Sequence, residues 1–393
     1  MKSSMTTRAR RITLFVVMLL LLFAIGTVSL PYARAASLIV RAANLGGRIE
    51  AIADRQSRVV TVQPAGVIPT RYGNVPSRLY VPEGGFSRTV LAVPGIHAAG
   101  IDETRLVGLA KDLAGTGVAV MTMALPDLVA YRITPQSPDV IEDAIAWLSR
   151  RPDLAPDGRI GVVGISFAGG LSTVAAGRPS VRDRTAFVLS FGGHADLPRV
   201  MRYLCTGEAP HVEGLETHPP HDYGVAVLLY FFADRGVVAP EQVQPLRDGV
   251  GTFLLASQLT LVDMKQANDT FARAREMVKT LPEPSATYLK YVNERNVKAL
   301  GPVLLPHVID VGGDPALSPE RAPAPAAPVY LLHGADDTVI PAAESVLLAR
   351  HLEGKTHVRL LLSRLITHAE VDRSAAASET WKLVLFWGDV LRQ

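Results

Sequence analysis

The sequence predicts an α/β fold in which a mainly parallel β-sheet is covered by helices on both faces. Two observations carry this prediction. From residue 89 onward, short apolar runs alternate with segments of helical period, a pattern that favours parallel strands connected by helices. One apolar run leads directly into the turn Gly-Ile-Ser-Phe-Ala-Gly-Gly at 164–170, and an apolar helical segment follows that turn.

Each predicted strand is a short apolar run that ends at Gly, Pro or another small residue. The runs lie at 89–95, 118–125, 159–166, 187–193 and 329–334. Helical period appears at 102–116 and 138–150, and a last helix is expected at 379–391. An amphipathic helix or stalk at 37–55 and extended segments at 58–62 and 75–81 precede this alternation.

The alternation stops between Gly193 and Pro328. About 130 residues here carry mostly helical signals, and a structureless loop of that length would be improbable in a compact domain. We therefore expect a helical cap inserted over one end of the sheet. The predicted organisation is a targeting segment (1–35), a lead-in (36–74), a core in two pieces (75–194 and 328–393) and the cap (195–327).

Composition excludes several classes of protein. Of the 393 residues, 48% are hydrophobic and the net charge is +3, so the chain is not of the disordered class. Much of the positive excess precedes residue 12, which does not make the basic face that nucleic acid requires. Cys205 is the only cysteine, so no intrachain disulfide forms. The Gly-rich turns at 164–170 and 192–193 lack the Gly-Lys-Ser/Thr of a phosphate loop, and no cofactor is predicted.

The N-terminus carries an export signal of one of two kinds. Residues 12–30 are uncharged and follow a basic stretch. As a helix they would extend about 28 Å, close to the hydrocarbon thickness of roughly 30 Å, which favours a single-pass membrane anchor. The small residues Ala33 and Ala35 also allow cleavage after Ala35 and secretion. Basic residues before the run hold the N-terminus inside, so both alternatives place the remainder of the chain outside the cytoplasm.

The turn around Ser166 predicts a nucleophile. At a sharp strand-to-helix turn, the central side chain is exposed above the sheet, and the residues two before and two after must be small. Gly164 and Ala168 satisfy this requirement. The following N–H, of Phe167, lies at a helix N-terminus where an oxyanion would be stabilised. The alternative is a tight turn in which Ser166 only caps the helix.

The remaining chain supplies a base and an acid in a suitable order. A serine nucleophile needs a general base, and the base needs an orienting acid. Asp336 and Asp337 follow the apolar run at 329–334, and His368 follows them before the last helix. The expected order is Ser166, Asp337, His368, each at a strand end.

These motifs resemble the α/β-hydrolase superfamily, and within it the dienelactone-hydrolase-like and acyl-CoA-thioester-hydrolase-like bacterial members. The resemblance covers about 75–378 apart from the cap. It is carried by Val-Pro-Gly-Ile-His at 93–97, Gly-Ile-Ser-Phe-Ala-Gly at 164–169, His-Gly-Ala-Asp-Asp-Thr-Val-Ile-Pro at 333–341, and Thr-His at 367–368.

The resemblance implies roles for particular residues. The acid is the fifth residue of the His-Gly-x-x-Asp turn, which is Asp337, with Asp336 as the fallback and Asp196 as a weaker alternative. The second oxyanion donor lies in the loop after the first core strand. There the family has His-Gly where this chain has Pro94-Gly95. Ile96 is therefore the expected donor, and His97 competes with it.

Two further features have less specific interpretations. His211, His218, His221 and nearby acids form a cluster of possible metal ligands, but the spacing matches no known site. A polar loop at the rim of the pocket is the favoured interpretation, and no metal is predicted. Cys205 has no base near it in the sequence, so a buried and inert thiol is expected.

Three hypotheses for function follow. The first is an exported or membrane-anchored serine hydrolase that cleaves a carboxylic ester of a small-molecule substrate. The second keeps the triad but acts as an acyltransferase, thioesterase or peptidase. The third is a hydrolase-fold protein that binds without catalysis. Substrate identity, acyl chain length and oligomeric state do not follow from the sequence.

Overall fold

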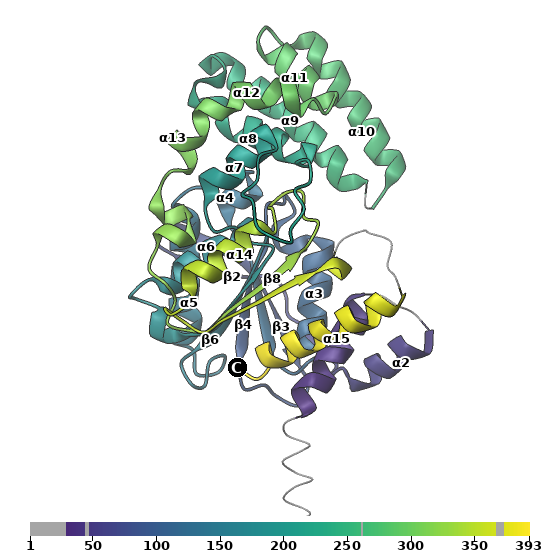
Figure 1. The fold of residues 1–393 in the computed structure, drawn as a ribbon, viewed down its shortest axis with the longest axis vertical. Helices are drawn as coiled ribbons and strands as arrows, with labels where there is room; N and C mark the ends of the chain where they lie inside the picture. Colours follow the sequence, from purple (N-terminus) through teal and green to yellow (C-terminus); the bar gives the residue numbers. More distant parts are fainter. Residues whose placement is uncertain (1–28, 44–46, 261, 367–372) are drawn as a thin grey trace, which may run out of the picture.

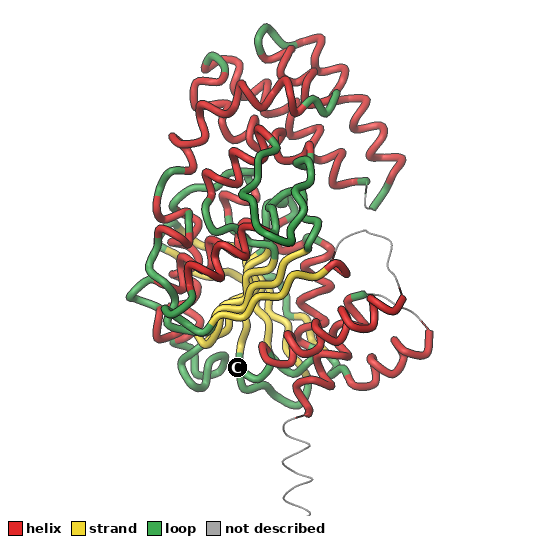
Figure 2. Tube along the Cα trace, in the orientation of Figure 1, coloured by secondary structure: helices red, strands yellow, loops and turns green. Residues whose placement is uncertain are grey.

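The computed structural model describes residues 29–43, 47–260, 262–366 and 373–393. Its centre is one mixed sheet with helices on both sides, and a further group of helices lies above one edge of that sheet (Figures 1 and 2). The strands are β1 (Val60–Val62), β2 (Gly66–Thr70), β3 (Gly73–Pro82), β4 (Thr89–Val93), β5 (Ala119–Met123), β6 (Ile160–Ile165), β7 (Thr185–Phe191), β8 (Val329–Gly334) and β9 (Val358–Ser363).

The sheet is parallel through its centre and antiparallel at one side. Its order is β1-β3-β5-β4-β6-β7-β8-β9, with β2 also paired to β3. Neighbours from β5 to β9 run parallel, whereas β3 pairs antiparallel with β5, β1 and β2. The predicted α/β class is therefore confirmed, with an antiparallel side added to the expected parallel core.

Helices cover both faces of the sheet, as the alternating side chains of β4 illustrate. Val90 and Ala92 pack on one face with α3 and α15, while Leu91 and Val93 face the cluster that contains α5 and α6. The helices outside the cap are α2 (Gly47–Gln56), α3 (Thr104–Ala114), α4 (Pro126–Val129), α5 (Gln136–Ser149), α6 (Phe167–Gly177), α14 (Ala343–Leu352) and α15 (Arg373–Val390). Because both faces are covered, the strands read as continuous apolar runs.

The longer elements described between β7 and β8 are all helices. It contains α7 (Leu197–Thr206), α8 (Asp222–Phe232), α9 (Pro240–Leu259), α10 (Met264–Met277), α11 (Ser285–Asn293), α12 (Val297–Leu304) and α13 (Val308–Gly312). Figure 1 shows α8 to α12, which form most of the predicted cap (195–327), stacked above the edge of the sheet. A clamp at Arg295 joins the cap helices, since the guanidinium pairs with Asp222 and lies over the rings of Phe253 and Phe271.

Strands β2 and β9, helices α4 and α14, and a break within 37–55 were not predicted from the sequence. β2 contains Pro69 and pairs only with β3, so its sequence gives a weak strand signal. Among the described strands, β9 pairs with β8 alone, and it is half-buried over most of its length. It therefore lacks the fully buried run that marks a central strand. The expected helix or stalk at 37–55 is two helical segments, 29–42 and α2.

Part of the expected membrane anchor lies outside the described residues. Residues 29–30 begin the first described helix, and 12–28 are not described. No helix within the described ranges is both long and apolar enough to span a membrane.

Candidate active site

Ser166 occupies a strained turn between β6 and α6. Its backbone has φ 56° and ψ −132°, a conformation that L-residues rarely adopt and that is concentrated at functional sites. Its N–H donates to the carbonyl of Phe191 at 2.7 Å, and its carbonyl accepts from the N–H of Gly169 at 2.8 Å. The Ser166 side chain makes no capping hydrogen bond to α6. Capping therefore does not explain this serine.

Close backbone approach explains the small residues around the turn. A Cβ at Gly164 would lie 2.3 Å from the carbonyl oxygen of Ala168, closer than any real contact. A Cβ at Gly95 would lie 2.9 Å from Cβ and 3.5 Å from Oγ of Ser166. The loop after β4 is thus pressed against the serine, which is where a second oxyanion donor is required.

The expected oxyanion donors lie on the two segments that meet here. Phe167 is the first residue of α6, so its N–H has no partner within the helix. Ile96 follows Gly95 and is half-buried. Its N–H donates to no backbone carbonyl of the described residues.

His97, the competing donor, takes part in its own loop. Its Nδ1 accepts from the N–H of Ala99 at 3.2 Å. Burial lowers the pKa of His97, so the neutral ring is favoured. Because Nδ1 accepts a hydrogen bond, the proton of the neutral ring is assigned to Nε2.

Asp337 is held in the turn after β8 by backbone donors. Its Oδ1 accepts from the N–H groups of Val339 at 2.8 Å and Ile340 at 3.0 Å. Its Oδ2 lies 3.5 Å from Nε2 of His333, and that nitrogen also lies 2.8 Å from the carbonyl oxygen of Ile340. Burial raises the pKa of Asp337, but the His333 ring and the two N–H groups outweigh burial, and the net pKa is below its usual value. The carboxylate is therefore ionised at neutral pH.

The two alternative acids are engaged elsewhere. Oδ1 of Asp336 lies 3.6 Å from Nε2 of His218, on the loop between α7 and α8. Asp196 caps α7 by accepting from the N–H of Arg199 at 2.9 Å, and it pairs with Arg321 at 2.6 Å.

The carboxyl ends of β6, β7 and β8 bring Ser166 and Asp337 to one edge of the sheet. Ser166 is hydrogen-bonded to the end of β7, and the Asp337 Oδ2 lies 3.6 Å from the position that a Cβ of Gly192 would occupy. β9 pairs with β8 as far as Ser363, opposite Gly334, and Ser363 accepts from the N–H of Ala335 at 3.0 Å. His368 lies outside the described residues, five positions beyond Ser363.

The histidine and acid cluster at 211–222 divides into separate contacts. His221 Nδ1 accepts from the N–H of Tyr223 at 3.1 Å at the start of α8, and the N–H of His221 donates to Thr338 at 2.8 Å. Within the described residues, no group of three or more His, Cys, Asp or Glu side chains is arranged to hold a metal ion. The loop instead borders the turn after β8 that carries Asp337, which we call the acid turn.

Cys205 is buried in α7 and has no role at this edge. Burial raises its pKa to about 12, so the thiolate, the reactive form, is scarce at neutral pH. We expect a maleimide to label native protein slowly, and to label it rapidly once urea unfolds the chain. Fast labelling of the native protein, followed by mass spectrometry, would show that the thiol is accessible.

A buried carboxylate that the sequence analysis did not identify holds the loop after β7. Glu344, on α14, is fully buried and accepts from the N–H groups of Ala195 at 2.9 Å and Asp196 at 3.0 Å. It also pairs with Arg199 at 2.5 Å. From sequence alone, a single Glu at this position is expected on the surface. Only the tertiary contacts show that Glu344 is buried.

Loss of the Glu344 charge should be strongly destabilising. Breaking a buried ion pair by removing one partner costs about 3–5 kcal/mol. We therefore expect Glu344→Gln to lower the free energy of unfolding by a few kcal/mol in a urea titration. Glu353→Gln, at the exposed end of the same helix, is the control and should change it by less than about 0.5 kcal/mol. Equal effects would exclude this role for Glu344.

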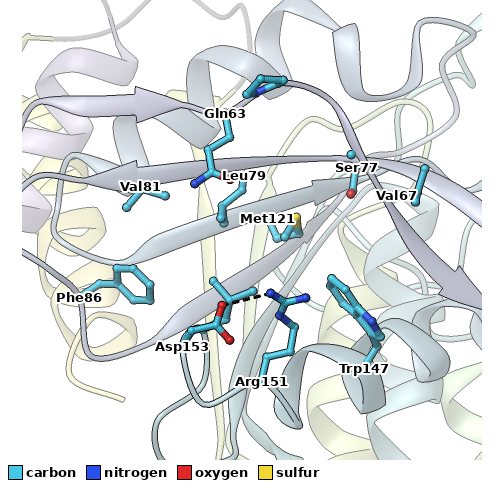
Figure 3. Close-up of a pocket in the computed structure, with 13 residues that line it drawn as sticks. Gln63, Val67, Ser77, Leu79, Val81, Phe86, Met121, Trp147, Arg151 and Asp153 are labelled. Atoms are coloured by element: carbon cyan, nitrogen blue, oxygen red, sulfur yellow. Dashed lines mark hydrogen bonds and ion pairs between the residues drawn. The ribbon is translucent and has the colours of Figure 1, made fainter.

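A separate cavity lies between the antiparallel side of the sheet and α5. Its volume is about 380 Å³, and its walls include Leu79, Met121 and Trp147 (Figure 3). Arg151 lies over the Trp147 ring, 4.9 Å from its centroid, and pairs with Asp153 at 3.1 Å. None of the predicted site residues lines this cavity, so it is distinct from the candidate active site.

Comparisons with known proteins give only distant similarities. No protein-family model and no curated protein matches the chain. Among solved structures, it is similar to a hyperthermophilic esterase from Pyrobaculum calidifontis, with 14% identity over 93% of both chains and a TM-score of 0.43. It is also similar to an esterase from Pyrococcus furiosus (13% identity, 86% of this chain, 93% of that one, TM-score 0.44). A third similarity is to Pyrococcus horikoshii acylaminoacyl peptidase (13% identity, 86% of this chain, 42% of that one, TM-score 0.42).

At these identities and scores the similarities support no statement about activity. The fold assignment rests on the chain's own geometry. The mostly parallel sheet, the strained serine turn after β6 and the acid turn after β8 together define an α/β-hydrolase fold. The predicted fold class is confirmed, while the dienelactone-hydrolase-like subfamily stays a prediction.

Proposed function

We propose that this protein is a serine hydrolase that cleaves a carboxylic ester through an acyl-enzyme. The observation that carries the proposal is the geometry at Ser166. Its φ is 56°, its side chain caps no helix, and the Gly95 backbone is pressed against it. A strained serine beside a free helix N-terminus and a second backbone loop is the arrangement that acyl transfer requires.

In the proposed first step, Oγ of Ser166 attacks the ester carbonyl. His368 takes the hydroxyl proton and passes it to the departing alcohol. The N–H groups of Phe167 and Ile96 stabilise the oxyanion of the tetrahedral intermediate. In the second step, His368 takes a proton from water as the water oxygen attacks the acyl-enzyme, and it then gives that proton to Oγ of Ser166 as the bond between Oγ and the acyl carbon breaks and the acid product leaves.

Asp337 is the proposed orienting acid. Its Oδ1 accepts from the N–H groups of Val339 and Ile340, which fix the carboxylate, and Oδ2, 3.5 Å from Nε2 of His333, is the oxygen proposed to accept from the imidazole of the base. The side chain remains ionised, so it can hold the imidazole in the required tautomer and stabilise the imidazolium. The pairing of β9 with β8 supports His368 as the base, since the chain leaves Ser363 beside the acid turn.

The cap is proposed to shape the substrate pocket, although not through the apolar run at 225–232. By its sequence, this run could either pack in the core or line the pocket; all of its residues except Tyr230 are buried in packing within the cap. A polar contact joins cap and core instead. Nε2 of Gln258, on α9, donates to the Tyr131 hydroxyl at 2.9 Å, and the Tyr131 and Tyr230 ring centroids are 5.3 Å apart.

We also propose that residues 12–30 tether the catalytic domain to a membrane from outside the cytoplasm. The support is the length and lack of charge of this run after a basic stretch. Secretion after cleavage near Ala35 is the alternative. Fractionation of cells expressing the chain, with N-terminal sequencing of the product, separates the two.

The proposed reaction is tested with p-nitrophenyl esters of increasing acyl length on the purified full chain. Turnover with a burst of p-nitrophenol is expected if an acyl-enzyme forms. Adding an alcohol acceptor distinguishes hydrolysis from acyl transfer, because only a transferase gives new ester in place of free acid. Absence of any burst or turnover across the series would instead favour a hydrolase-fold binding protein.

A further inference from the structure

The helix α2 presents an outward surface that the hydrolase core does not use. Ile49 and Ile52 are one turn apart on this helix and are 60% and 58% exposed. Arg48 and Arg55 are also exposed, and at spacings of three, four and seven residues they share a side of the helix with Ile52. We call Arg48, Ile49, Ile52 and Arg55 the α2 outer face.

The acidic residues of α2 lie off this face. Ala53 is buried, and its carbonyl accepts from Oγ of Ser37 at 2.7 Å, which marks the side that packs on the helix over 29–42. Glu50 is half-buried and Asp54 is exposed. Each is two positions from Ile52, so neither shares the side of the helix on which Arg48, Ile52 and Arg55 lie.

The α2 outer face lies at the end of the molecule away from the cap (Figure 1). The N–H of Arg58, two residues beyond α2, donates to the Gly115 carbonyl at 2.9 Å, just before β5 begins. This is the amino edge of the parallel strands, whereas Ser166 lies at the carboxyl edge. The helix over 29–42 packs here too, since the Tyr32 hydroxyl donates to Asp389 at 2.8 Å near the C-terminus.

We infer that the α2 outer face binds the surface of an anionic phospholipid membrane. Two observations select this occupant. The uncharged run at 12–30 extends into the sequence of the helix over 29–42, against which α2 packs, so the proposed anchor would hold α2 close to lipid. The face also combines aliphatic side chains with arginines while Glu50 and Asp54 lie off it, the pattern of a helix that lies in a membrane interface.

This inference goes beyond the proposed ester hydrolysis and uses the proposed anchor only to select the partner. It has a consequence for the site. With α2 on the lipid, the carboxyl edge of the sheet and the cap lie at the far end of the molecule. The catalytic edge then faces the aqueous phase, and the substrate arrives from water.

The test places a fluorophore at single sites of the full chain. Ile52→Cys is labelled with an environment-sensitive probe, and Val262→Cys in the cap, where the residue is 76% exposed, is the matched control. Unmodified protein, with only the buried Cys205, gives the background. In vesicles of phosphatidylcholine and phosphatidylglycerol, nitroxide-labelled lipid should quench the probe at 52 several-fold more than the probe at 262.

A charge-reversal pair tests the arginines. Arg48→Glu with Arg55→Glu should reduce quenching at 52, whereas Arg273→Glu with Arg275→Glu on α10 of the cap should not. All four residues are exposed and none belongs to the proposed catalytic machinery, so unchanged turnover of a soluble ester verifies folding.

The outcomes separate this inference from the anchor. Equal quenching at 52 and 262 in membrane-bound protein overturns the inference and leaves the anchor standing. Protein found only in the soluble fraction overturns the anchor, and the 52 probe is then read after phosphatidylglycerol vesicles are added. Quenching there supports the inference, and its absence overturns it.

A second copy of the chain is the alternative occupant. If a pyrene at 52 gives excimer fluorescence that rises with protein concentration, without lipid quenching, the face binds a second copy and the inference is overturned.

Discussion

Ser166→Ala is expected to abolish labelling by a fluorophosphonate probe and to lower kcat for esters by about 10⁶-fold. The probe reacts with an activated serine hydroxyl, and no other group at the proposed site supplies that nucleophile. The Ser166 hydroxyl makes no capping hydrogen bond, so the variant should fold as the wild type does. Gel fluorescence after labelling and ester turnover are the two measurements.

Ser180→Ala is the matched control, because Ser180 is an exposed serine just beyond the end of α6. It should retain labelling and turnover. Labelling that persists in Ser166→Ala would show that another residue is the nucleophile, and the proposed mechanism would then be wrong. Circular dichroism and Tm of each variant distinguish lost chemistry from lost structure.

Asp337→Asn is expected to lower kcat by about 10⁴-fold in a protein that still folds, although with a lower free energy of unfolding because the ionised carboxylate is lost. The asparagine carbonyl can still accept from the N–H groups of Val339 and Ile340, so the turn is preserved. The amide that replaces Oδ2 cannot hold the imidazole in the tautomer that makes it a base. Steady-state kinetics on a p-nitrophenyl ester measure the loss.

The neighbouring carboxylate provides the comparison. Asp336→Asn removes a charge 3.6 Å from His218 in the loop before α8 and should change kcat by only a few-fold. A large loss in Asp336→Asn, together with near-normal activity in Asp337→Asn, would reverse the assignment of the acid.

The pKa of Asp337 also predicts how the fold responds to acid. Because this pKa is lowered in the folded protein, ionised Asp337 stabilises the folded state at all pH values above its unfolded pKa. That contribution is lost as pH falls below the unfolded value toward the folded one. Urea titrations at decreasing pH should therefore show this loss of stability in the wild type and a smaller loss in Asp337→Asn.

Local sequence patterns predicted most of the core because they record burial directly. The runs that became β4 to β8 are apolar on both sides, as strands inside a doubly covered sheet must be. Gly164 and Ala168 flank Ser166 because the turn leaves no room for larger side chains. These constraints act within a few residues, so they are visible without a structure.

Two strands at the margins of the sheet were not predicted. Pro69 and exposed positions weaken the pattern of β2, and β9 is half-buried over most of its length. Glu344 looks like a surface helix residue until Ala195, Asp196 and Arg199 converge on it. The apolar run at 225–232 resembled a pocket wall, yet it packs inside the cap.

By itself, the sequence determined the fold class, the sharp turn at Ser166 and the order of the candidate triad, because short-range sterics and strand burial depend on neighbouring residues. Only the tertiary structure decided how the candidate residues meet. In the folded chain, the Gly95 backbone packs against Ser166, the Asp337 carboxylate lies beside Gly192, and Asp196 pairs with Arg321. It also turned Ile52 and Arg48 of α2 outward, away from the core. These placements join segments that are distant in the chain, and such contacts depend on packing of the whole sheet.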